Sequence, residues 1–339
     1  MPPIITFILG LGALILLHEL GHFLVARLFK IEIEEFGIGF PPRMIKLFEL
    51  NGTEYTLNWI PLGGFVRPKG ENDPTVPGGL AAANPFARLA VLAAGPIMNI
   101  LVGILLGMML FYSLGDPILD QVRIEDIAPG SPADRAGLRA GDLLVSIAGE
   151  EIDSREKVVE VINKNLDKPV ELVYRRGGRE FSVSLVPRSD PPPNEGAIGI
   201  LMGNPTRPIN LGTAMYRGAY ATFENIKAIL LLPVRLFEGT ASPEEGRLIG
   251  YRGMYEIYTE LQSPLYFFMA ISISLGVMNL LPIPALDGGR ILLTLPEILL
   301  RRRIPQQYEN MIHLIGFTLL LLLIIYINVQ DFINPIELP

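Results

Sequence analysis

Residues 4–29, IITFILGLGALILLHELGHFLVARLF, decide both the fold and the chemistry of this chain. This stretch is apolar for longer than the ~20 residues that a helix needs to cross the core of a bilayer. His18, Glu19 and His22 interrupt it. Ionisable groups inside a membrane-spanning helix are costly and are usually functional. We therefore expect a membrane protein with a polar site in its first helix.

Composition limits which functions and ligands are available. The chain has 339 residues, of which 50% are apolar, and a formal net charge of −7. That charge does not suit a protein that neutralises phosphates, so we expect no nucleic-acid partner. With 0 cysteines and 3 histidines, any metal site has to use histidine or carboxylate ligands.

Three further apolar stretches predict spanning helices, at about 86–112, 265–281 and 312–327. The fold class expected is an α-helical membrane protein with four transmembrane helices, a re-entrant β-hairpin and an inserted β-rich domain. The expected segments are helix 1 (1–30), a loop with the hairpin (31–84), helix 2 (85–114), the β-rich domain (120–203), a linker with an interfacial helix (204–262), helix 3 (263–300), and helix 4 with a tail (301–339).

Lysine and arginine in the short loops predict the orientation, because cytoplasmic loops are enriched in these residues. They cluster between spans one and two, and again between spans three and four. The residues are Lys30, Arg43, Lys46, Arg67, Lys69, Arg88, Arg290, Arg301, Arg302 and Arg303. Both loops are expected in the cytoplasm, and the β-rich domain outside it.

The segment between spans two and three carries strand signals at 122–127, 170–175 and 180–186. The turn Arg176-Gly177-Gly178-Arg179 indicates a hairpin. The proline run that ends at Asn194 indicates an exit linker. Residues 211–237 have one apolar helical face, interrupted by charges, and are expected to form an interfacial amphipathic helix.

The run His18-Glu19-Leu20-Gly21-His22 matches H-E-x-x-H. On a helix, the i, i+4 spacing places both imidazoles on one face, where they can share a zinc ion. Glu19 beside them would be the general base toward water that zinc activates. The competing interpretations are a chance match and a polar pairing within a helix bundle.

Catalytic zinc usually has three protein ligands, and the sequence offers two candidates for the third. His313 lies near the start of the fourth span. Asp287 follows the third span at Asn279-Leu280-Leu281-Pro282-Ile283-Pro284-Ala285-Leu286-Asp287-Gly288-Gly289. The orientation places Asp287 on the same side as His18 and His22, which makes it the better candidate. Without the histidine pair, a turn or helix-capping aspartate would be the simpler interpretation.

Together these motifs resemble the site-2 protease family, and within it the bacterial regulator-of-sigma-E protease branch. The likeness rests on three motifs in the same order: HELGH, Gly95-Pro96-Ile97-Met98-Asn99, and residues 279–289. It implies that His18, His22 and Asp287 hold Zn²⁺ and that Glu19 activates water. It also implies that Asn279 and Pro282 seat the substrate, with Asn99 as a further substrate-binding candidate.

The resemblance extends to the hairpin and to the β-rich domain. The hairpin, with Gly63 and Gly64 in Ile60-Pro61-Leu62-Gly63-Gly64-Phe65-Val66, is similar to a re-entrant loop that binds an unwound substrate at its edge; a plain cytoplasmic hairpin is the alternative. The motifs at 128–133, 136–138 and 140–142 look like a PDZ domain. Residues 198–200 would form either its carboxylate-binding loop or a closing strand. The best-known branch member has two PDZ domains, and this chain has room for one.

The function that this resemblance implies is zinc-dependent cleavage of the membrane helices of single-pass proteins. Substrates would be anti-sigma-factor-like proteins or remnant signal peptides, with a peptide C-terminus as a candidate ligand of the PDZ domain. The chain would be a multi-pass protein of the bacterial inner or plasma membrane in contact with lipid, its PDZ domain extracytoplasmic and its active site toward the cytoplasm. The rival functions are a proton or ion transporter and a non-catalytic PDZ scaffold.

Overall fold

The computed structural model describes residues 2–193, 195–242, 245–261, 263–301 and 303–335. Asn194 of the expected exit linker and Arg302 of the expected cytoplasmic loop lie outside the described residues, as do the expected segment ends at 1, 262 and 339. The chain forms two compact units, residues 1–110 with 211–339, and residues 111–210.

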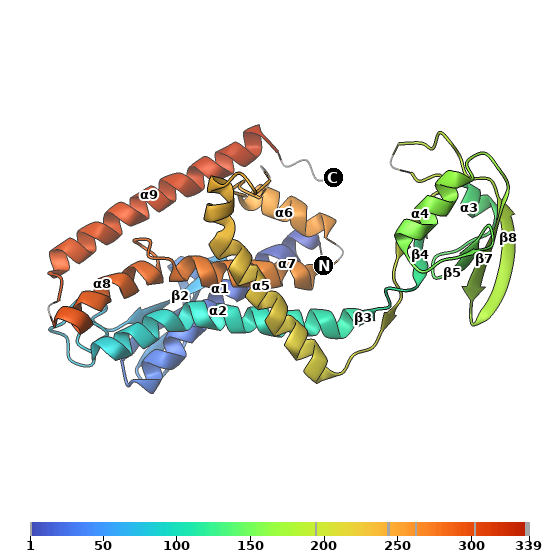
Figure 1. The fold of residues 1–339 in the computed structure, drawn as a ribbon. Coiled ribbons are helices and arrows are strands. Elements are labelled where there is room, and N and C mark those ends of the chain that lie inside the picture. The colour runs from blue at the N-terminus through green and yellow to red at the C-terminus, as the bar shows by residue number, and fades with distance from the viewer. Residues whose placement is uncertain (1, 194, 243–244, 262, 302, 336–339) are drawn as a thin grey trace. The chain divides into compact units, whose positions relative to one another are not determined.

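The first unit consists of helices and one long hairpin (Figure 1). Its elements are α1 (Pro3–Leu28), β1 (Ile33–Leu50), β2 (Thr53–Pro68), α2 (Pro85–Leu114), α5 (Leu211–Phe237), α6 (Tyr251–Glu260), α7 (Pro264–Leu280), α8 (Asp287–Leu300) and α9 (Gln306–Ile333). Helix α2 continues by four residues into the second unit.

In the described part of the chain, three helices are long and apolar enough to cross a membrane: α1, α2 and α9. Helix α7 is also apolar, but its 17 residues extend only ~25 Å, which is shorter than the ~30 Å hydrocarbon core. The apolar stretches of the sequence therefore all form helices, while the count of four spans stays a prediction. Helix α5 forms where an amphipathic helix was expected, and its interfacial location also stays a prediction.

Helices α1 and α2 pack closely because glycine replaces a side chain where they meet. A Cβ atom on Gly21 of α1 would lie 2.4 Å from the carbonyl oxygen of Ala94, which is far inside normal contact. A Cβ atom on Gly95 of α2 would lie 2.3 Å from Nε2 of His22. Small residues at a helix interface allow such backbone approach in membranes, and here they bring α2 against the histidine face of α1.

The hairpin β1–β2 is longer than the sequence indicated and turns at Asn51 and Gly52, both of which have positive φ. Residues 36–38 pair with 64–66 of β2 and also with 55–57 of the same strand. The segment at Gly63 and Gly64 packs on α1, where a Cβ on either glycine would clash with Ile15 or Leu16. One end of the hairpin is thereby held beside the histidine helix.

The second unit is a β-rich domain. Its elements are β3 (Asp116–Pro117), β4 (Val122–Ile127), α3 (Pro132–Arg135), β5 (Leu143–Ile147), β6 (Glu150–Glu151), α4 (Arg155–Lys164), β7 (Val170–Arg176), β8 (Arg179–Leu185), β9 (Ile200–Gly203) and β10 (Thr206–Arg207). The main sheet has the order β8-β7-β5-β4-β9, with β6 pairing β5. The strands expected near 122, 170 and 180 are confirmed, as is the turn between β7 and β8, where Gly177 and Gly178 have positive φ.

One ion pair ties the loops of this domain to its sheet. Asp142, whose side chain is 1% exposed, accepts two 2.6 Å hydrogen bonds from the guanidinium of Arg176. The same guanidinium donates to the carbonyl oxygen of Gly137, and Asp142 also accepts the backbone N–H of Arg139. The pair thus fixes the loop 137–142 against the end of β7.

Candidate metal centre

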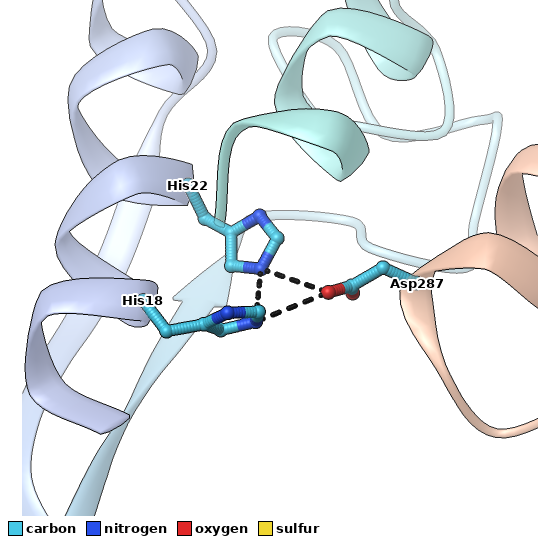
Figure 2. Close-up of side chains that lie close together, drawn as sticks. All are labelled: His18, His22 and Asp287. Carbon is cyan, nitrogen blue, oxygen red and sulfur yellow. Dashed lines mark hydrogen bonds and ion pairs between the residues drawn. The ribbon is translucent and has the colours of Figure 1, made fainter. Parts of the chain in front are cut away.

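Three side chains from opposite ends of the chain converge in the first unit. Figure 2 shows the rings of His18 and His22, from α1, pointing at the carboxylate of Asp287, from the start of α8. Nε2 of His18 lies 3.1 Å from Nε2 of His22 and 3.1 Å from Oδ2 of Asp287. Nε2 of His22 lies 3.4 Å from the same oxygen. The side chains of the three residues are between 10% and 19% exposed.

The spacing of these atoms fits a tetrahedral zinc ion. Ligand atoms ~2.0–2.2 Å from one zinc in tetrahedral geometry stand about 3.3–3.6 Å apart. The three measured separations, 3.1, 3.1 and 3.4 Å, lie within a few tenths of an ångström of that range. Two imidazoles and a carboxylate also match the donor types of catalytic zinc sites, which leave a fourth position open.

Two glycines explain how Asp287 reaches the histidines. Helix α7 ends at Leu280, two residues before Pro282, and the chain turns back before α8 begins. A Cβ on Gly288 would lie 2.1 Å from the carbonyl oxygen of Leu281, and one on Gly289 would lie 2.3 Å from that of Ile283. Only glycine allows the first turn of α8 to fold against this loop, and that turn carries Asp287.

Asp287 does not act as a helix cap, and His313 is not part of the cluster. The N-cap of α8 is Leu286, with no side-chain hydrogen bond, and Asp287 turns toward the imidazoles. Among the described residues, the one group of three possible metal ligands is His18, His22 and Asp287. His313 instead accepts the backbone N–H of Ala285 at Nδ1, 3.3 Å away, and so supports the loop that precedes Asp287.

The far side of each imidazole faces α2. Nδ1 of His22 donates to the carbonyl oxygen of Val91 at 2.8 Å, which leaves Nε2 of that ring free to bind a metal. Nδ1 of His18 lies 3.3 Å from the side-chain amide of Asn99. Ligating histidines usually have such a partner on the other ring nitrogen. The sequence analysis did not predict the contacts of the imidazoles with Val91 and Gly95. The signal that could have indicated them is the four-residue spacing of Val91, Gly95 and Asn99, which places the three on one helix face.

Glu19 lies beside the cluster and faces a cavity. Its Oε2 accepts the backbone N–H of Val66 at 3.1 Å, so the carboxylate is held between the histidine helix and the hairpin. A cavity of about 320 Å³ is lined by all four site residues. The other lining residues are Phe65, Val66, Pro68, Glu71, Leu80, Val91, Leu92, Asn279, Ala285, Leu286 and Arg290.

The other expected site residues fall into different positions. Asn279 lines the cavity, with its Nδ2 donating to the carbonyl oxygen of Leu275 in its own helix. Gly63 and Gly64 lie on α1 next to the lining residues Phe65 and Val66. Pro282 and Asn99 do not line it. The structure brings together the expected metal ligands and Glu19, and Asn99 lies behind His18 instead of in the cavity.

An ion pair at the cavity was not anticipated from the sequence. Arg290, one turn beyond Asp287 on α8, pairs with Glu71 in the loop after the hairpin, and both line the cavity. Of the two, Arg290 had been interpreted only as a loop charge that sets the orientation. Arg290 and Glu71 come from segments more than 200 residues apart in the chain, and no local pattern indicates that they meet.

This chain is similar to known peptidases over most of its length. Residues 6–323 match the model of the family described as Peptidase family M50. A Clostridium perfringens protein, named provisionally as a zinc metalloprotease, is 33% identical, with 98% of this chain and 99% of that protein covered. The zinc metalloprotease RasP of Oceanobacillus iheyensis is 27% identical, with 98% and 99% covered.

Among solved structures, the PDZ domain of the SdrC-like protein from Listeria innocua is 28% identical over 24% of this chain and 93% of that domain, with a TM-score of 0.22. The family model covers the histidine helix, the hairpin and the loop of Asp287 in a single match. On that match, and on a relative that is 33% identical over almost the full length of both proteins, this chain belongs to peptidase family M50.

Proposed function

We propose that this membrane metalloprotease hydrolyses peptide bonds within or beside the transmembrane segments of single-pass proteins. The observation that carries the proposal is the convergence of His18, His22 and Asp287 on a helix apolar enough to span a bilayer. A hydrolytic site at that depth has membrane-embedded peptide bonds as its nearest substrates. The zinc metalloprotease names of the relatives support Zn²⁺ as the metal.

In this proposal, His18 and His22 would hold zinc through Nε2 and Asp287 would hold it through Oδ2. Zinc bound there would supply a Lewis acid that lowers the pKa of water toward neutral pH and polarises the scissile carbonyl. Glu19 takes the proton from water and passes it to the leaving amine. Its bond to the N–H of Val66 orients the carboxylate toward the cavity.

The hairpin would present the substrate in an extended form. A peptide bond in a helix is shielded and hydrogen-bonded, and lipid cannot satisfy the backbone groups that unwinding releases. Strand addition at a sheet edge satisfies them. Residues 64–66 pair with 36–38 on one side, and the N–H of Val66 turns toward Glu19. This arrangement supports an edge at Gly63 and Gly64 that receives the unwound substrate.

Asn279 would seat the substrate on the opposite wall, and Pro282 would support it from outside the cavity. Asn279 lines the cavity from the end of α7, and its amide would turn from the carbonyl oxygen of Leu275 toward a substrate carbonyl. Pro282 helps to end α7 and to form the irregular backbone before Asp287, since it has no N–H for the helix. This backbone runs against a cavity, where such structure is tolerated at membrane depth.

The second unit would be a PDZ domain outside the cytoplasm, in a bacterial inner or plasma membrane. A groove of about 620 Å³ is lined by α4 residues, including Val159 and Glu160, and by Ile200, Leu201 and Met202 of β9. A peptide C-terminus could add as a strand beside β9. This groove supports a role of the second unit in binding the C-terminus of a substrate. The substrates we propose are anti-sigma-factor-like proteins or remnant signal peptides.

The test is cleavage of a single-pass membrane substrate by the purified protein in detergent. Glu19→Gln keeps the size and the hydrogen bond to Val66 but cannot take a proton, and loss of a general base costs ~10²–10⁴ in rate. We expect zinc content to be unchanged and turnover to fall by at least a hundredfold. Equal turnover in Glu19→Gln and the parent would remove Glu19 as the base, and cleavage of water-soluble peptides alone would contradict the intramembrane role.

A further inference from the structure

We infer that Asn99 is a positioning residue that accepts a hydrogen bond from Nδ1–H of His18 and so presents the Nε2 lone pair of that ring before the metal binds. The inference rests on the proposed zinc site and gives Asn99 a role different from substrate binding. Its side chain is 0% exposed and does not line the cavity. A substrate in the cavity therefore does not reach it.

The polar contacts of Asn99 fit a partner of His18. Nδ2 of Asn99 lies 3.3 Å from Nδ1 of His18, while Oδ1 is buried without a hydrogen-bond partner among the described residues. A donating Nδ2 would force the His18 proton onto Nε2, the atom that faces Asp287 and His22. That tautomer has no lone pair for a metal.

A 180° rotation about the Cβ–Cγ bond of Asn99 exchanges the positions of its amide oxygen and nitrogen and moves no other heavy atom. In either orientation of the amide, one of its two polar atoms faces His18 and the other has no hydrogen-bond partner among the described residues. The protonation of His18 therefore decides which orientation is favoured. When Nε2 binds a metal, the neutral ring carries its proton on Nδ1. Oδ1 is then the amide atom that can accept this proton, and Asn99 selects the tautomer that binds.

His22 has the same arrangement with a backbone partner. Its Nδ1 donates to the carbonyl oxygen of Val91 at 2.8 Å. Val91 and Asn99 flank Gly95 at four-residue intervals on α2, and Gly95 allows the helix backbone to reach both rings. One face of α2 therefore supports both imidazoles, through a carbonyl at Val91 and through a side chain at Asn99.

Helix α7 holds Asn99 in place from behind. The hydroxyl of Ser272, which is 0% exposed, donates to the backbone oxygen of Asn99 at 2.8 Å. A Cβ on Gly276 would lie 3.4 Å from Cβ of Asn99 and 2.8 Å from the carbonyl oxygen of Pro96. The position of the amide is thus fixed by a close contact between two apolar helices, as a positioning role requires.

The experiment measures zinc affinity of the full-length protein in detergent by competition with a chelator. Asn99→Leu removes the acceptor, and we expect zinc to bind 10–100-fold more weakly, the usual effect of losing such a partner. Asn99→Asp can only accept a hydrogen bond, so its affinity is expected to stay within about threefold of the parent. Asn225→Leu is the matched control, because within the described parts of the chain the side chain of Asn225 donates only to the carbonyl oxygen of Ala221 in its own helix. Its affinity is expected to equal that of the parent.

Parent-like affinity in Asn99→Leu would overturn the inference, as would an Asn99→Asp variant as weak as Asn99→Leu. If the leucine variant does not fold, ring ¹⁵N spectra of the zinc-free parent decide, because the chain has only 3 histidines to assign. A proton on Nδ1 of His18 supports the inference, and a proton on Nε2 overturns it. His22→Ala distinguishes failure of the proposed zinc site from failure of the positioning role of Asn99. If His22→Ala and the parent bind zinc equally, or if neither binds zinc, the proposed zinc site is wrong.

Discussion

Gly95 gives the sharpest structural test of how α2 shapes the site. In Gly95→Ala, the new Cβ would lie 2.3 Å from Nε2 of His22 and 2.8 Å from Nε2 of His18. Ordinary contact begins at 3.4 Å, so the His22 nitrogen must move by 3.4 − 2.3 = 1.1 Å or α2 must retreat by a similar distance. Zinc–ligand distances tolerate only ~0.2 Å of deviation. We therefore expect zinc affinity to fall by more than ~100-fold, since the 1.1 Å displacement is several times that tolerance.

The assay for Gly95→Ala is zinc affinity by chelator competition, followed by cleavage of a membrane substrate. Gly107→Ala is the matched control on the same helix, about three turns beyond Gly95, because its Cβ would meet Cα of Gly218 and Sδ of Met269, each at 3.0 Å. Overpacking there is expected to cost ~1–3 kcal/mol of stability without changing zinc affinity. Parent-like zinc binding by Gly95→Ala would refute the reasoning that α2 sets the ligand positions.

Two other predictions concern the hairpin and the second unit. Gly63 has φ +84, and a Cβ there would meet Ile15 at 2.8 Å. An L-residue in the left-handed region costs ~1–2 kcal/mol. Gly63→Ala is therefore expected to lower kcat/KM for a membrane substrate about tenfold. Zinc content should be unchanged, and parent-like cleavage would count against a substrate-binding edge. In Arg176→Leu, Asp142 loses both guanidinium bonds, and the opening free energy of the second unit is expected to fall by ~3 kcal/mol. Hydrogen exchange of β5 and β7 measures this, and unchanged protection would contradict it.

The apolar helices were predictable because their signal is local. Proline marks the start of α2 at Pro85 and of α7 at Pro264, and uninterrupted apolar residues fix their approximate lengths. The i, i+4 spacing of His18 and His22 follows from helix geometry alone. These features need no knowledge of the rest of the chain, so the sequence was enough to predict them.

Asp287 was harder to predict because it lies 265 positions after His22 in the chain. No spacing rule links two such positions, and Asp287 was favoured over His313 by the expected membrane orientation and by the family resemblance. The role of Gly288 and Gly289 in bringing it to the site depends on contacts with the carbonyl oxygens of the preceding loop. Those contacts exist only in the folded chain.

The partners of the imidazoles could not be found from the sequence for a similar reason. A backbone carbonyl, such as that of Val91, leaves no trace in residue identity. The residue type of Asn99 suggested either a substrate contact or a bond between helices. Its burial and the 3.3 Å distance from its Nδ2 to Nδ1 of His18 support the positioning role that we propose. The pairing of Arg290 with Glu71 likewise depends on how α8 packs against the loop after the hairpin.

X-ray absorption at the zinc edge of the purified, zinc-loaded protein tests the central claim most directly. The account predicts one zinc per chain, with two imidazole nitrogens and carboxylate oxygen at ~2.0–2.2 Å, and loss of one imidazole contribution in His22→Ala. A spectrum without imidazole, or one that His22→Ala and Asp287→Ala leave unchanged, would contradict it.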